Sequence, residues 1–221
     1  MLTSNVSGII ICVVSLLVPQ LVRAQGAIYV SDLGQASVGS QAIGSDAWYA
    51  AAFGTGTNST GYVIDSIQLE MTGGLGNPSG FSLMIYTNGP TSANYPGGSV
   101  VALNGSLNPG ASGIYTYSPS ASFTLSPSTD YYLVLSAATP VVIGSYEWSL
   151  AGANSYNLSG GWAAGAGHVS TSVNGLTWQE APVAFPEFAI TATEAPEPSP
   201  WSLVLLGAGI FIKICRGGVR R

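Results

Sequence analysis

Hydrophobic and polar residues alternate along most of the middle of the chain. The clearest case is Ser66–Met71, where Ile67, Leu69 and Met71 are separated by polar residues. Alternation with a period of two is typical of a β-strand with one buried face. Short segments rich in β-branched and aromatic residues recur between stretches of Gly, Pro, Asn and Ser. We predict strands over Ala27–Leu33, Trp48–Phe53, Tyr62–Thr72, Phe81–Thr87, Ser99–Leu103, Ile114–Ser118, Ser122–Leu125, Asp130–Ala137, Tyr146–Leu150 and Phe185–Thr193.

Many short strands at this spacing predict an all-β domain, a single antiparallel β-sandwich of jelly-roll-like form over residues 25–193. No stretch of the middle has a convincing helical period. The glycine-rich segment Gly73–Gly80 is expected to be a turn between two strands. Asn154–Gly175 fits either a long loop or a pair of weak strands around Trp162 and His168–Val173.

Charge divides the chain into three parts. Only 7% of residues are charged, all ten acids lie between Gln25 and Pro198, and none of the five cations does. A nucleic-acid partner is excluded because phosphates require clustered Lys and Arg. Both cysteines, Cys12 and Cys215, lie in the ends, so the middle has no disulfide and no thiolate metal site. Ends that differ this much from the middle indicate targeting segments.

The N-terminal end has the pattern of a signal peptide. Gly8–Val18 is an apolar run too short to span a membrane, and Pro19 follows it. Val22-Arg23-Ala24 is a small-residue cleavage site, so residues 1–24 are expected to form a signal helix that is removed after passage through the secretion translocon. The alternative, a buried N-terminal helix, has no amphipathic pattern to support it.

The C-terminal end combines a proline-rich linker, a short apolar segment and a basic tail. Residues 194–200 are the linker, and residues 201–221 are predicted to form a short apolar helix and the tail. The apolar run ends at Cys215, which makes a helix about 22 Å long against a hydrocarbon core of roughly 30 Å. A span this short indicates a membrane segment that is recognised and then removed, with a plain membrane anchor as the alternative.

This C-terminal order resembles the PEP-CTERM sorting signal of Gram-negative bacteria. The resemblance rests on Pro196-Glu197-Pro198, on Trp201, on the Leu- and Gly-rich run and on the basic tail with Arg216, Arg220 and Arg221. It implies that an exosortase-type enzyme recognises the tail and cleaves near the motif. The protein is then expected at the cell surface or in the exopolysaccharide matrix, after transient anchoring in the inner membrane by its transmembrane helix.

The middle resembles the choice-of-anchor domains attached to such tails, type R in particular. The similar segments are residues 48–56, residues 66–69, residues 83–87, and residues 130–135 followed by Trp148. That family has no established activity, so the resemblance implies a fold and a destination only.

Candidate catalytic residues are few. His168 is the single histidine, and no G-x-S-x-G nucleophile turn occurs, so a Ser-His-Asp hydrolase is not expected. A glycan-active hydrolase would need two carboxylates across a cleft, and the acids beside aromatic residues are Glu147 and Glu180.

No cofactor is predicted, although structural calcium is compatible with acids in an extracellular β protein. Asp32, Asp46 and Asp65 are the single acids considered for it.

Aromatic residues in the less regular segments are candidates for contacts with sugars. Trp162, Trp178 and Tyr156 are expected to be exposed there, and flat aromatic faces suit stacking on sugar rings. The sequence thus predicts a secreted, non-enzymatic component of the cell surface or exopolysaccharide matrix. A carbohydrate-binding (lectin-like) module is the second interpretation, and a glycan-active hydrolase is the third.

Overall fold

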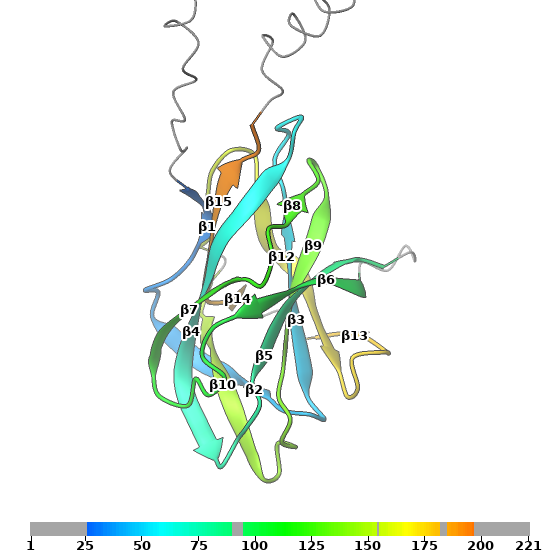
Figure 1. The fold of residues 1–221 in the computed structure, drawn as a ribbon. Helices are drawn as coiled ribbons and strands as arrows, with labels where there is room; N and C mark the ends of the chain where they lie inside the picture. The colour runs from blue at the N-terminus through cyan, green and yellow to red at the C-terminus, as the bar shows by residue number, and fades with distance from the viewer. Residues whose placement is uncertain (1–25, 90–94, 154, 182–184, 197–221) are drawn as a thin grey trace, which may run out of the picture.

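The computed structural model describes residues 26–89, 95–153, 155–181 and 185–196. These residues form an all-β protein (Figure 1). No helix in these ranges is long and apolar enough to cross a membrane. The predicted signal helix and C-terminal apolar helix lie outside the described residues. The strands are β1 (Ala27–Ser31), β2 (Ser37–Ile43), β3 (Trp48–Gly54), β4 (Tyr62–Gly76), β5 (Ser82–Asn88), β6 (Pro96–Asn104), β7 (Gly113–Pro119), β8 (Thr124–Leu125), β9 (Asp130–Ser136), β10 (Gly144–Ala151), β11 (Asn157–Leu158), β12 (Ala163–Ser172), β13 (Gln179–Glu180), β14 (Phe185–Pro186) and β15 (Phe188–Glu194).

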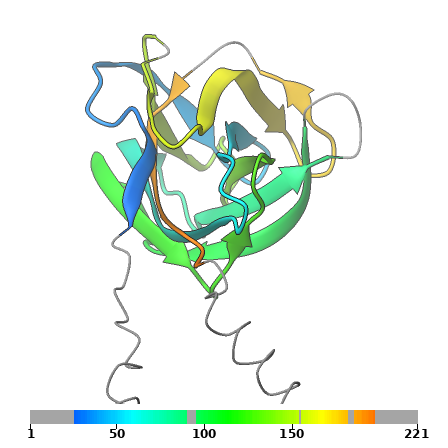
Figure 2. The same cartoon turned by 90° about the horizontal axis from the view of Figure 1, so that it is seen from above.

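The strands are joined into one large antiparallel sheet. Its main path runs β11-β1-β15-β4-β7-β6-β5-β9-β3-β12-β13, while β10 pairs with β2, β4 and β14 to one side. Seen from above, the sheet curls around the interior (Figure 2). The link between β6 and β7 is short, with Leu103 opposite Pro119 and Asn104 opposite Ser118. The predicted all-β, antiparallel class is therefore confirmed.

The alternating segments form strands with one face in the core, as predicted. In β4, Ile67, Leu69 and Met71 are buried while the residues between them are half-buried. β5 and β9 bury residues on both faces, and each pairs with a strand on both sides, so neither lies at an edge of the sheet. Their inner faces join the main hydrophobic cluster, and their outer faces join a smaller one.

Aromatic side chains fill much of the main cluster. Trp148 has no exposed surface, and it meets Tyr49 edge-to-face with ring centroids 6.0 Å apart. Its indole Nε1 donates a hydrogen bond to the backbone oxygen of Glu187 at 3.0 Å. Burying an aromatic ring of this size removes about 150–250 Å² from water, and a polar group at its edge needs such a partner.

The predicted turn over Gly73–Gly80 is wrong in its first half. β4 continues to Gly76, and its last residues pair with β10, with Gly76 opposite Gly144. Only glycine fits at residue 76 without strain, because φ is +66° there and a Cβ would lie 2.4 Å from the backbone oxygen of Ile143. The glycines that predicted a turn therefore allow the backbones of two neighbouring strands to approach closely.

The glycine-rich stretch after Asn154 contains strands rather than one long loop. β11 pairs with β1, and β12 pairs with β3 and β13. The prediction missed β2, most of whose residues are exposed or half-buried, because its polar sequence gives no hydrophobic period. β2 is held instead by its backbone pairing with β10.

The two ends of the described chain lie side by side. β1 pairs antiparallel with β15, with Ala27 opposite Ala192 (Figure 2). β4 pairs with β15 at its start, with Tyr62 opposite Glu194, and with β10 at its end. It therefore runs from the end of the molecule where β1 and β15 lie to the end where β2 and β10 meet (Figure 1).

Candidate functional site

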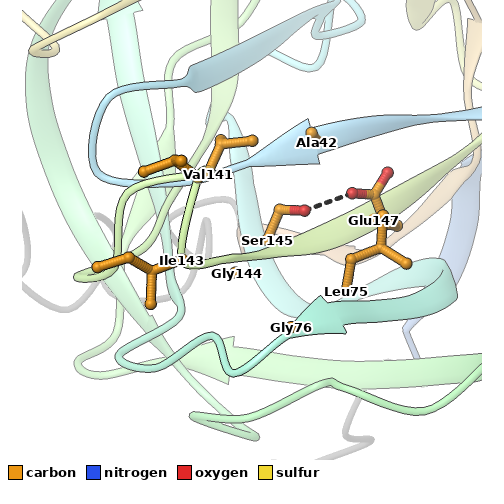
Figure 3. Close-up of a pocket in the computed structure, with 9 residues that line it drawn as sticks. Ala42, Leu75, Gly76, Val141, Ile143, Gly144, Ser145 and Glu147 are labelled. Atoms are coloured by element: carbon orange, nitrogen blue, oxygen red, sulfur yellow. Dashed lines mark hydrogen bonds between the residues drawn. The ribbon is translucent and has the colours of Figure 1, made fainter.

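A hollow of about 290 Å³ lies where β2, the end of β4 and the start of β10 meet. Figure 3 shows Leu75 and Glu147 beside each other, with Val141 and Ile143 on the loop before β10. The hollow is lined by Ala42, Leu75, Gly76, Val141, Val142, Ile143, Gly144, Ser145 and Glu147. Because it involves the far end of β4, it lies away from Ala27 and Glu194, near the ends of the described chain.

Glu147 is the one titratable residue among those that line the hollow. Its side chain is 8% exposed because β10 lies between β2 and β4. The hydroxyls of Ser145 and Ser40 each donate a hydrogen bond of 2.6 Å, one to each carboxylate oxygen. Two hydroxyl groups, rather than a basic residue, therefore fix the position of the carboxylate.

Exposed apolar side chains also line the hollow. Leu75 is 63% exposed, Val142 is 89% exposed and Ile143 is 60% exposed. The hollow thus combines one fixed carboxylate with an exposed apolar rim. Hydrolysis of a glycosidic bond would require a second carboxylate, and none is among the lining residues.

Two of the aromatic residues expected to be exposed for sugar contacts are buried, and the third is half-buried. Trp162 is 3% exposed, and its ring stacks on Tyr29 with centroids 4.9 Å apart and on Phe53 at 6.0 Å. Trp178 is 9% exposed and belongs to the smaller hydrophobic cluster. Tyr156 is half-buried, packs against the main core and donates a hydrogen bond to Pro186 at 2.7 Å. The expected exposure is wrong because short strands and turns fold these rings inward.

A different set of aromatic residues lies on the outer face of β3, β5 and β9. The buried members of this smaller cluster include Tyr86, Tyr132 and Trp178. Trp48 and Tyr95 pack against them and remain half-buried. Sequence analysis missed this grouping, although the alternation in β3 does place Trp48 on the face opposite Tyr49.

The acids considered for calcium have unlike surroundings. Asp46 and Asp65 are exposed and accept hydrogen bonds of 2.8 Å from Val141 N–H and from the Thr193 hydroxyl. Asp32 has no exposed surface. Burial raises its pKa to about 7, and the nearby charge of Glu187 adds to that rise.

Glu187 is a second acid without exposed surface, and sequence analysis did not single it out. Burial raises the pKa of its carboxyl, while the Ser149 hydroxyl, which donates to that carboxylate, opposes the rise. The signal that could have found it is its position between the apolar pairs Phe185-Pro186 and Phe188-Ala189.

The remaining predicted residues are placed only in part. His168 lies on β12, and Glu180 is exposed on β13. Pro196 is exposed at the end of the described chain. The rest of the sorting motif and tail, Glu197, Pro198, Trp201, Arg216, Arg220 and Arg221, lies outside the described residues. Among the residues that the structure describes, no group of three or more His, Cys, Asp or Glu is arranged to hold a metal ion.

Comparison with protein-family models, curated proteins and solved structures finds no match to this chain.

Proposed function

We propose that the protein is a secreted, non-enzymatic component of the cell surface or exopolysaccharide matrix, sorted by its C-terminal signal. The observation behind this proposal is the order of Pro196-Glu197-Pro198, the short apolar run and the arginine-containing tail. An exosortase-type enzyme in the inner membrane of a Gram-negative bacterium would recognise this segment.

The position of the motif relative to the β domain supports the proposal. The backbone N–H of Ala195 donates to Gly61 at 3.0 Å, and the Thr60 hydroxyl donates to the backbone oxygen of Ala195. The next residue, Pro196, is exposed. The motif thus begins directly after the last anchored residue, where an enzyme has access to it.

The arrangement of the ends also suits display at a surface. β1 and β15 leave the domain at the same end, and the apolar hollow lies at the other. A tail held at a membrane would therefore direct the hollow outwards. In finer detail, we propose a jelly-roll-like sandwich in which the groups containing β4 and β9 face each other across the main cluster.

Mass spectrometry of the surface fraction of an exosortase-containing bacterium tests the sorting proposal. The wild-type protein is expected to lack its tail from near Pro196 onward. Replacing Pro196, Glu197 and Pro198 by Ala should leave the tail intact and the protein in the membrane fraction. The matched control is Glu194→Gln, an exposed acid outside the motif. An intact tail on surface-exposed wild-type protein would show that the sorting proposal is wrong.

Carbohydrate binding on the outer face of β3, β5 and β9 is a second candidate function. It is favoured by the half-buried Trp48 and Tyr95, which lie together with three buried aromatic residues. A sugar ring that stacks on Trp48 would have to bind on this face. Binding on a glycan array should be lost in Trp48→Ala and retained in Tyr115→Ala, which removes a half-buried ring on another strand. Absence of glycan binding by the wild-type protein contradicts this candidate.

A further inference from the structure

Two carboxylates in the described domain, those of Asp32 and Glu187, have no exposed surface. Each has one oxygen with a close hydrogen-bond partner, and Tyr156 near Asp32 and the backbone of Gln35 near Glu187 also favour the charged forms. Asp32 Oδ1 accepts a hydrogen bond from the backbone N–H of Phe188 at 2.9 Å, and Glu187 Oε2 accepts one from the Ser149 hydroxyl. The other oxygens, Asp32 Oδ2 and Glu187 Oε1, are buried without a hydrogen-bond partner. Leaving a buried carboxylate oxygen unpaired is costly unless something neutralises the charge.

These two acids are brought near each other by Phe188, the residue that follows Glu187 and bonds to Asp32. Asp32 follows β1, and its backbone N–H donates to Phe188 at 3.2 Å, so it lies against the junction of β14 and β15. Glu187 occupies that junction, and its charge raises the pKa of Asp32. Glu70, half-buried on β4, accepts a hydrogen bond from Gly34 N–H at 3.1 Å and adds to the negative potential at Glu187.

Among the residues that the structure describes, no Lys or Arg is present to neutralise this site. The sequence contains no Lys or Arg between Gln25 and Pro198. Its one histidine, His168, lies on β12, which pairs with β3 and β13 and with none of the strands that flank the two acids. Within the described domain, a compensating positive charge can therefore come only from solution, as a metal ion or as a proton.

We propose that Asp32 and Glu187 bind one calcium ion. The two unpartnered oxygens supply the charged ligands, and carboxylate oxygens are the donors that calcium prefers. Neutral oxygens at the same place are the Ser149 hydroxyl, the Tyr156 hydroxyl and the Pro186 carbonyl. Because calcium takes six to eight oxygen ligands, water molecules would complete the shell. Gly34 and Gln35, in the β1–β2 loop directly after Asp32, are exposed.

Calcium binding and simple protonation of the two carboxyls predict different effects of pH. A bound calcium ion replaces the proton that burial otherwise favours on these carboxyls, so calcium affinity should rise with pH. The inference is independent of the sorting signal, because it involves only residues within the β domain.

Thermal unfolding of the purified full-length chain, with EDTA or with calcium chloride at pH 8, tests the proposal. A calcium concentration one hundred times the Kd should raise Tm by about 5–10 °C. Asp32→Asn and Glu187→Gln should abolish this rise. Glu180→Gln, which changes an exposed acid on β13, should preserve it. An absent calcium response in the wild type, or an equal response in Asp32→Asn and Glu180→Gln, would overturn the proposal.

A second measurement on the wild-type protein does not depend on whether the variants fold. Terbium should show luminescence sensitised by Tyr156 or Trp148, whose polar groups contact Pro186 and Glu187. Calcium should displace the terbium with a stoichiometry of one, and more tightly at pH 8 than at pH 5. Stability that depends on pH in EDTA, together with absence of calcium-displaceable terbium emission, would mean that the site binds protons only and would refute the proposal.

Discussion

Burial sets the ionisation of Asp32, whose pKa rises from its ordinary value of 3.8 to about 7. Below the lower value, both the folded and the unfolded chain hold the proton. Between the two values, the folded chain keeps a proton that the unfolded chain has lost. The free energy of unfolding should therefore fall as pH rises from about 4 to about 7, and then level off. Glu187, whose pKa is also raised, acts in the same direction.

Urea unfolding in EDTA across this pH range measures the effect. One pKa unit corresponds to about 1.4 kcal/mol, so Asp32 should account for a loss on the order of 4 kcal/mol. Asp32→Asn should remove most of this slope, whereas Asp130→Asn, at an exposed residue, should leave it unchanged. Equal slopes in the wild type and in Asp32→Asn would contradict the assignment.

Trp162 is a core residue despite its glycine-rich neighbours. Its ring also meets Tyr62 edge-to-face, with centroids 5.1 Å apart. We expect Trp162→Ala to lower the free energy of unfolding by about 3–5 kcal/mol because it leaves a cavity. Leu176→Ala, at a side chain 84% exposed, should change it by less than about 0.5 kcal/mol. Similar midpoints for the two variants in urea would show that the Trp162 ring is not packed as described.

At the level of strands, the end of β4 depends on glycine. Gly76→Ala should destabilise the protein by more than about 1 kcal/mol, because φ is +66° and the new methyl group would meet the backbone of Ile143. Gly39→Ala on β2 is the matched control, since its methyl group would have no atom within 4 Å. It should be neutral or stabilising. Chemical denaturation of both variants measures the change in the free energy of unfolding. If Gly76→Ala were as stable as the wild type, β4 would have to end earlier.

Strand prediction succeeded where side chains alternate and failed where the backbone alone determines pairing. β4, β5 and β9 have apolar residues on one face at every second position, so their existence followed from the sequence. β2 has no such pattern, and it is a strand because β10 pairs with it. A ladder of backbone hydrogen bonds requires a neighbour, which no local sequence pattern specifies.

At the scale of the whole molecule, β15 joins the first strand, β1, to the rest of the sheet. It lies between β1 and β4, and its residues Ile190 and Ala192 have no exposed surface. A chain ending at Pro196 should therefore keep its Tm within about 2 °C of the full-length value. A chain ending at Glu187 should lose cooperative unfolding. Circular dichroism during heating compares the two, and a folded chain without β15 would contradict the topology.

The sequence by itself determined the all-β class, the absence of cations from the middle and most strand positions, because period-two alternation and composition are local properties. It also supplies the C-terminal pattern on which the sorting proposal rests. Only the tertiary structure decided which residues come together. It folded Trp162 and Trp178 into hydrophobic clusters and buried Asp32 beside Glu187, 155 positions further along the chain. Burial and pairing between distant segments depend on how strands are joined across the sheet, and that information is not contained in any single stretch of sequence.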